Sequence, residues 1–246
     1  MSTNIIITSG KGGVGKSTAA VFLAKELAGM GKNTLLIDSD TALGADEIIA
    51  GVGESAAFNW DDILCERCEK AQGLTEVCDN LSLIACPKYI PEEVPDDAFS
   101  RLAETYGEDF DYILIDCPAG VDNDFRKAAA AAKKALIVAT ADGISIACAS
   151  ETAEQLIGLG YKETDLRLLV NRFVKKAAKR SRLLNIDGAI DKSGVRLIGI
   201  LPEDKRIPFM SVTGKGPDKS GRFMLAAERV AKRIAGESVP LALNKL

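Results

Sequence analysis

The chain has 246 residues, of which 47% are hydrophobic and 27% are charged, and its formal net charge is −4. This length favours one α/β domain over residues 1–246, and the negative charge argues against a protein that binds nucleic acid through its bulk charge. No apolar run approaches the about 18 residues of a membrane-spanning helix, and no signal peptide precedes the first strand, so we expect a cytoplasmic protein. Histidine is absent, which excludes histidine-based catalysis and metal binding.

The first expected element is a buried strand at residues 4–8, an apolar and mostly β-branched run. Directly after it, Gly10–Ser17 fits the phosphate-binding pattern G-x-x-x-x-G-K-[ST]. Residues 17–30 have the apolar spacing of a helix, and Gly31 suits its end. A glycine-rich loop between a strand and a helix can hold phosphate with its backbone N–H groups and the helix dipole.

This loop predicts a nucleotide site rather than a chance glycine-rich turn. Lys16 would reach the β- and γ-phosphates, and the Ser17 hydroxyl would bind Mg²⁺. The glycines would let the backbone approach the ligand closely. The expected nucleotide-binding residues of the loop are Gly10, Lys11, Gly12, Gly13, Val14, Gly15, Lys16, Ser17 and Thr18.

A second strand is expected at residues 33–38, and it ends in Asp38-Ser39-Asp40. Acidic residues are common in turns, but here they follow a strand at the edge where ligands of α/β sheets bind. Phosphoryl transfer needs carboxylates that hold Mg²⁺ and orient the attacking water. We therefore interpret Asp38 and Asp40 as site residues.

The region from residue 41 to residue 110 is less informative. It predicts a helix at 57–68, a strand at 81–85, and a helix at 96–106 capped by Asp96.

Four of the six cysteines lie in this region, at Cys65, Cys68, Cys78 and Cys86. The C-x-x-C pair could begin a metal site, but no second such pair follows, so ordinary reduced thiols are the preferred reading.

A strongly apolar strand at residues 111–116 ends in Asp116 and is followed by C-P-A-G. An apolar strand that ends in a carboxylate is the Walker B arrangement, which places the acid near Mg²⁺. The alternative for Asp116 is a helix cap or turn residue.

The second half of the chain predicts strands at 135–140, 166–171 and 195–202, and helices at 144–159 and 222–235. The strand at 166–171 leads into Asn171-Arg172, and Val174 stands where the guanine-reading N-K-x-D motif has aspartate. We therefore expect ATP rather than GTP. The helix at 222–235 is expected to dock on the sheet, and the tail after it has one lysine and is interrupted by Pro240, unlike basic amphipathic membrane helices.

Six of the eleven residues from 172 to 182 are basic. Three interpretations remain open for this basic run: a solvated face, a contact with an anionic membrane or acidic partner, or a DNA contact.

The segment K-G-G-V-G-K-S, with its extra lysine at Lys11, resembles the deviant Walker A box of the MinD/ParA ATPases. The similarity extends along most of the chain and is greatest to the MinD branch, through D-x-P-A-G at 116–120, L-P-E-D at 201–204 and G-K-G-P at 214–217. The resemblance implies a single doubly wound, mostly parallel sheet with helices on both faces. It also implies slow Mg-ATP hydrolysis that switches an ATP-bound homodimer to an ADP-bound monomer.

The resemblance further implies individual roles. Lys11 crosses the dimer interface to the partner's nucleotide, Asp40 positions the nucleophile, and Asp38 serves the metal and water network. The remaining implied contacts are Gly120 as γ-phosphate sensor, Asn171 and Arg172 beside the base, and the backbone at Pro202 bordering it. The aspartate that holds the resting lysine in MinD falls on Cys148 here, with Asp142 six residues earlier.

Three functional classes follow. The first is a MinD-type regulator of cell division or a similar surface process, with an activator or effector protein, peripheral at the inner face of the membrane. The second is a ParA-type DNA partition ATPase that binds DNA through residues 172–182. The third is a metal or iron–sulfur carrier ATPase of the same superfamily.

Overall fold

The computed structural model describes residues 1–41, 44–53, 55–89, 91–179, 184–210 and 216–241. These residues form an eight-stranded sheet in the order β3-β4-β2-β5-β1-β6-β7-β8. Every neighbouring pair is parallel except β3 and β4. The strands are β1 (Thr3–Ser9), β2 (Thr34–Asp38), β3 (Thr75–Cys78), β4 (Leu81–Ile84), β5 (Tyr112–Ala119), β6 (Lys134–Thr140), β7 (Leu166–Phe173) and β8 (Leu197–Pro202).

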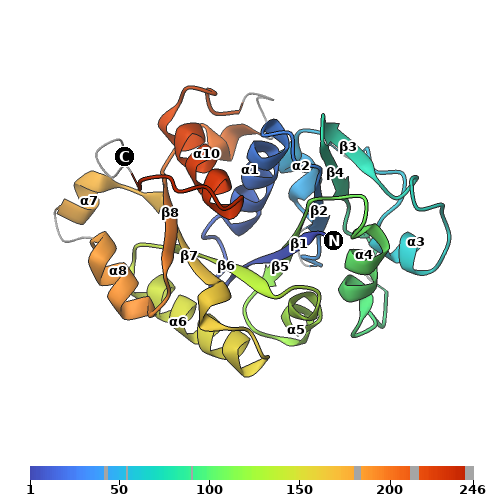
Figure 1. Cartoon of the computed structure of the whole chain (residues 1–246), viewed down its shortest axis with the longest axis horizontal. Coiled ribbons are helices and arrows are strands. Elements are labelled where there is room, and N and C mark those ends of the chain that lie inside the picture. The colour runs from blue at the N-terminus through green and yellow to red at the C-terminus, as the bar shows by residue number, and fades with distance from the viewer. Residues whose placement is uncertain (42–43, 54, 90, 180–183, 211–215, 242–246) are drawn as a thin grey trace.

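Helices cover both faces of the sheet, with α1 and α10 on one side and α5 and α6 on the other (Figure 1). The α-helices are α1 (Lys16–Gly29), α2 (Asp46–Ala50), α3 (Trp60–Leu64), α4 (Ala98–Tyr106), α5 (Asn123–Ala130), α6 (Gly143–Gly158), α7 (Lys175–Lys179), α8 (Ile186–Ser193) and α10 (Arg222–Ile234). Short 3₁₀ turns, η1 (Glu163–Asp165) and η2 (Ile207–Phe209), complete the described elements. The predicted doubly wound, mostly parallel sheet is confirmed.

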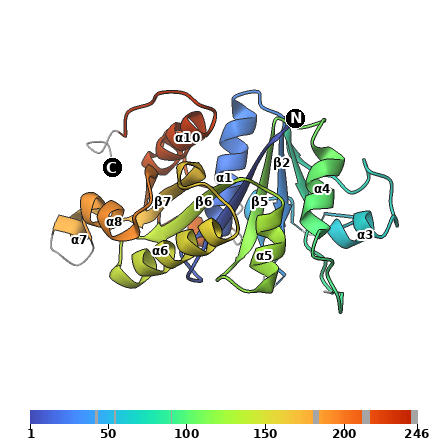
Figure 2. The ribbon, with the colours of Figure 1, turned by 60° about the horizontal axis from the view of Figure 1, so that its bottom comes forward.

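The alternation of side chains along the central strand explains the two helical layers. Ile6 points into the core beneath α4, α5 and α6, whereas Ile5 and Ile7 point into the core beneath α1 and α10. Because both faces of a parallel sheet are covered, its strands are apolar throughout instead of alternating with polar residues. The turned view in Figure 2 separates the two layers.

The connections place the phosphate loop, Gly10–Ser17, at the centre of the molecule. Strand β1 lies between β5 and β6, so the chain leaves β1 toward β2 on one side and later returns to build β6 on the other. Ligands of doubly wound sheets bind where the strand order reverses, at the carboxyl ends of the strands. The loop follows β1 at that end.

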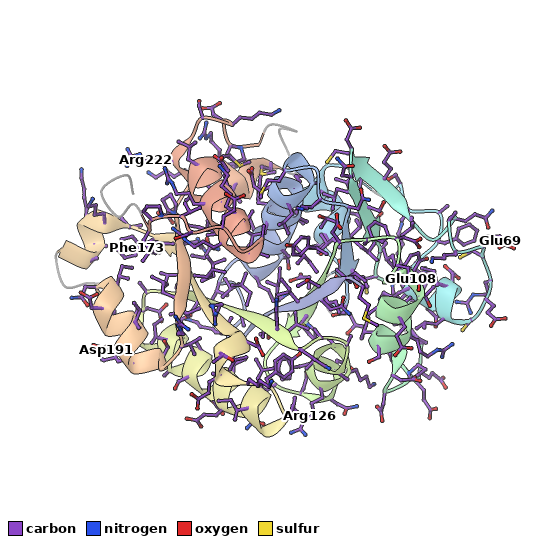
Figure 3. The ribbon with its side chains drawn as sticks, viewed as in Figure 1. Glu69, Glu108, Arg126, Phe173, Asp191 and Arg222 are labelled. Atoms are coloured by element: carbon purple, nitrogen blue, oxygen red, sulfur yellow. The ribbon has the colours of Figure 1, made fainter. Side chains whose placement is uncertain are left out.

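Among the described residues, the buried charged side chains are Lys16, Asp38, Asp40, Asp46 and Asp116, and the other charged side chains are exposed or partly exposed. Figure 3 shows Glu69 and Asp191 at opposite sides of the molecule, and both are exposed.

Two local predictions were wrong, and one strand was missed. The helix expected at 57–68 is only α3, because Asn59 and Asp62 form a capping box at its start and Glu66, with φ of 55°, ends the helical path. The α4 helix begins at Ala98 after Asp97, without the predicted Asp96 cap. The antiparallel edge strand β3 was not predicted. Its four residues alternate between partly buried and exposed positions, so the strand is too short and too weakly apolar to be recognised from its pattern.

The predicted docking of the last helix is confirmed. The α10 helix buries Phe223, Ala227 and Val230 against α1 and β8. Arg233 donates to the carbonyl oxygens of Val239 (2.8 Å) and Pro240 (2.6 Å), so the first part of the tail folds back on this helix.

The packing of α10 gives a first testable expectation. Phe223 is 2% exposed and its ring meets that of Phe22 edge-on at 5.1 Å, so Phe223→Ala should lower the free energy of unfolding by about 3–5 kcal/mol. Leu225→Ala, at a 38% exposed position on the same helix, should cost less than about 1 kcal/mol. Urea unfolding of both variants measures this, and equal losses would contradict a docked α10.

Candidate nucleotide site

The phosphate loop has a backbone shape that requires glycine at specific positions. Gly13 and Gly15 have φ of 77° and 85°, in the left-handed region that other residues rarely adopt. A Cβ on Gly10 would lie 2.5 Å from the carbonyl oxygen of Cys148, and one on Gly15 would lie 2.4 Å from Nδ2 of Asn171. Two of the glycines are therefore fixed by close packing as well as by the expected ligand.

Asn171 and Arg172, at the carboxyl end of β7, brace the same loop. The Asn171 amide donates to the carbonyl oxygens of Val14 (2.9 Å) and Gly15 (3.3 Å). Arg172 donates to the carbonyl oxygen of Gly13 at 3.1 Å, and its φ of 52° lies in the left-handed region. A contact of both residues with the adenine ring stays a prediction.

Lys16 points into a buried acidic pocket. Its side chain is 6% exposed, and Nζ lies 2.9 Å from Asp116 Oδ2 and 3.3 Å from Asp40 Oδ2. Burial alone would lower the pKa of this lysine, but the Asp116 and Asp40 carboxylates outweigh it and raise the pKa above its usual range. Lys16 is therefore a buried cation. Other anions could take the place of its present partners, the Asp116 and Asp40 carboxylates.

The structure brings Asp38 together with the other predicted acids. Asp38 accepts the backbone N–H groups of Asp40 (3.0 Å) and Asp46 (3.1 Å). Burial and the Asp116 charge raise its pKa to about 7, against the pull of these N–H groups and of Lys16. Burial also raises the pKa of Asp116, although Lys16 and the Ser17 hydroxyl oppose the shift.

The sequence reasoning missed Asp46. It begins α2, is fully buried, and offers an oxygen within 4.8 Å of oxygens of Asp38 and Asp116. Its sequence position, eight residues after Asp38, carries no motif signal. Among the described residues, this is the only cluster of three or more acidic or cysteine side chains with metal-ligand spacing. Three converging carboxylates, with one Asp116 oxygen unpartnered, fit the predicted Mg²⁺.

Lys11 lies at the mouth of the site and is paired there. Its Nζ is 3.7 Å from Asp142 Oδ1, and the two side chains are 44% and 35% exposed. Asp142 caps α6 by accepting the Ser145 N–H, which fixes the carboxylate beside the loop. Cys148 packs against Gly10, so the partner of Lys11 sits at the start of α6 instead of at the expected position within it.

Gly120 lies at the end of β5, next to the loop. Its φ of 102° permits only glycine, and its N–H donates to the Ser9 carbonyl oxygen at 2.9 Å. A γ-phosphate contact of this N–H stays a prediction, and it requires that bond to open.

A cavity of about 820 Å³ adjoins the loop, within the usual size range of small-molecule sites. Polar lining comes from Lys16, Ser17, Thr18 and Asn171, and Pro202 borders the cavity. The apolar lining includes Ile48, Ile49, Ile207, Phe209, Met210 and Phe223. The loop suits the phosphates of a nucleotide, and the apolar part of the cavity beyond the loop suits its base.

The cysteines form no metal cluster in the described ranges. Cys65 and Cys78 are exposed, whereas Cys86 is buried. Burial raises the pKa of Cys86 to about 12, so this thiol stays protonated. That the cysteines are ordinary thiols stays a prediction.

In the described part of the basic run, Arg172 and the residues of α7 are placed differently. Arg172 is turned toward the phosphate loop and lies 3.9 Å from Glu203, and only Lys175–Lys179 form the short helix α7. Residues 180–183, and 214–215 of the G-K-G-P segment, lie outside the described residues.

Comparisons with known proteins agree with this geometry. Residues 5–217 match the CobQ/CobB/MinD/ParA nucleotide binding domain. The septum site-determining protein MinD of Synechocystis is 33% identical over 98% of this chain and 92% of its own length, and that of Bacillus subtilis is 32% identical with the same coverage. The chain belongs to the MinD/ParA family. Both of these relatives are MinD proteins.

Solved structures extend the comparison. The MinC:MinD complex of Aquifex aeolicus has a TM-score of 0.89 and 30% identity, covering 98% of both chains. MinD of Pyrococcus horikoshii complexed with Mg-ADP, at 22% identity and a TM-score of 0.82, shares the fold. A plasmid partition protein of Borrelia burgdorferi bound to AMPPNP, at 22% identity and a TM-score of 0.73, also shares the fold.

The buried acids predict a pH dependence of stability. The folded-state pKa of Asp38 is about 7, against an ordinary value of 3.8, so the folded chain holds a proton that the unfolded chain has released. The contribution of Asp38 to the free energy of unfolding should therefore fall as pH rises from about 4 to about 7. Asp38→Asn should flatten this decline.

The measurement is urea unfolding across that pH range, without nucleotide and with a chelator. Asp79→Asn, at an exposed turn between β3 and β4, is the control and should keep the wild-type slope. Parallel curves for wild type and Asp38→Asn would contradict the raised pKa.

Proposed function

We propose that this chain is a Mg-ATP-hydrolysing dimerisation switch of the MinD type, which acts in the placement of cell division. The observation that carries the proposal is the separation of two lysines in one phosphate loop. Lys16 is buried among acids at the base of the site, whereas Lys11 stands at its mouth, half-exposed beside Asp142. One lysine serves its own nucleotide, and the other can reach across to a second copy.

Lys16 would exchange Asp40 and Asp116 for the nucleotide phosphates, and the loop N–H groups would hold the same phosphates. This exchange frees Asp40 to position the attacking water. Ser17, Asp38 and Asp116 would hold Mg²⁺, which neutralises phosphate charge when bound. Most of the rate enhancement would come from positioning and charge neutralisation.

A protein effector is part of the same proposal, because the similar MinD of Aquifex aeolicus was solved in complex with MinC. The proposal also includes a cytoplasmic location, with peripheral attachment at the inner face of the membrane. Among the described residues, no helix is long and apolar enough to cross a bilayer.

The two lysines should separate binding from turnover. Lys16→Ala should weaken ATP binding at least about 100-fold, a loss of ~2.7 kcal/mol, because it removes the buried cation that meets the phosphates. Lys11→Ala, in the same loop, should bind ATP normally but fail to hydrolyse it. Binding of a fluorescent ATP analogue and phosphate release measure the two steps, and wild-type affinity in Lys16→Ala would refute the site.

The water-positioning role belongs to Asp40. Asp40→Ala should keep ATP affinity within a few-fold and lower the hydrolysis rate by about 100-fold or more. The same variant should accumulate as an ATP-bound dimer in size-exclusion chromatography with light scattering. A normal hydrolysis rate in Asp40→Ala would mean that another residue positions the attacking water.

Co-sedimentation with anionic liposomes distinguishes the surfaces that the switch could bind. Pelleting with ATP but not with ADP supports membrane attachment. No pelleting, together with ATP-dependent DNA binding that weakens steeply with salt, would favour the partition class instead.

A further inference from the structure

The Asp46 side chain has no partner for either of its charged atoms. It is fully buried at the start of α2, and among the described residues neither carboxylate oxygen has a hydrogen-bond donor. One Asp116 oxygen, Oδ1, is also buried and without a donor. Native proteins rarely bury such groups unpaired, so these three oxygens point to a ligand that the protein chain does not supply.

The geometry around these oxygens suits a cation. One oxygen each from Asp38, Asp46 and Asp116 lies within 4.8 Å of the other two. Two oxygens on opposite sides of Mg²⁺ lie about 4.2 Å apart, and around the larger Ca²⁺ about 5 Å apart. The Asp46 backbone N–H donates to Asp38 Oδ2 at 3.1 Å, which holds the two acids together. A small movement would bring all three onto one ion.

The charge balance points the same way. Lys16 bonds to Asp40 and Asp116 but not to Asp46. When all of these acids are ionised, one lysine faces four buried carboxylates, counting Asp38. Since Asp38 already accepts two backbone N–H groups, each of its oxygens keeps a lone pair for a metal. The unbalanced charge lies around Asp46.

We propose that Asp38, Asp46 and Asp116 form a protein-held site for one hard divalent cation of the Mg²⁺ type, which binds before any nucleotide. In the proposed function above, Ser17, Asp38 and Asp116 would hold the metal beside a bound nucleotide; here three carboxylates hold it without one. Asp46 is the residue that adds this capacity, because Asp38 and Asp116 without it offer only two acids. ATP would then enter a site whose acidic charge is already partly neutralised.

The test uses the full-length chain without nucleotide and Mn²⁺ as the probe. Electron paramagnetic resonance of free Mn²⁺ should show about one bound ion per wild-type chain, displaced by excess Mg²⁺. Asp46→Asn preserves the size of the side chain and should weaken Mn²⁺ binding at least about tenfold. Asp79→Asn, the same change at an exposed position, should bind as wild type does.

Thermal unfolding supplies an independent readout and a folding check. Mg²⁺ should raise the Tm of the wild type and of Asp79→Asn, but not that of Asp46→Asn. With chelator, Asp46→Asn should be folded and at least as stable as the wild type, because a buried charge is gone. Failure of the wild type to bind Mn²⁺, or equal binding by Asp46→Asn, would overturn the proposal. The buried acids would then be neutralised by protons and not by a metal ion. Since no nucleotide is present, neither result depends on ATP hydrolysis.

Discussion

The contact between Lys16 and the buried acids is the constraint on which the site depends. A lysine that is 6% exposed is tolerable only because Asp116 and Asp40 lie within 3.3 Å of its Nζ. Those acids are in turn raised in energy by burial, and Lys16 offsets only part of their charge. In the proposed function, this site would gain from anionic phosphate at the lysine and from a cation at the carboxylates.

The sheet brings these charges together without any local sequence relation among them. Lys16 follows β1, Asp38 ends β2, and Asp116 lies in β5, and these three strands are neighbours in the order β2-β5-β1. Parallel strands bring their carboxyl ends to one edge, so residues 22 to 100 positions apart in the chain meet there. The apolar cores on both faces fix the strands and hence the positions of the charges.

The mouth of the site is built differently from its base. Lys11 and Asp142 are partly exposed, and at 3.7 Å their pairing is weak enough to exchange. Asn171 and Arg172 hold the loop from β7 through three carbonyl oxygens, which leaves its N–H groups for a ligand. In the proposed function, Lys11 would leave Asp142 to reach a second copy, while Asn171 and Arg172 keep their contacts with the loop.

The sequence by itself determined the strand–loop–helix around Gly10–Ser17, the central apolar strands, and the acids at their ends, because these follow from local pattern and hydrophobic periodicity. It did not predict β3 or the short α3, whose bounds depend on an edge pairing and a capping box. Only the tertiary structure decided that Asp46 joins Asp38 and Asp116, that Asp142 receives Lys11, and that Asn171 braces the loop. Such contacts join residues that carry no common motif, and they exist only once the sheet has brought distant segments to one edge.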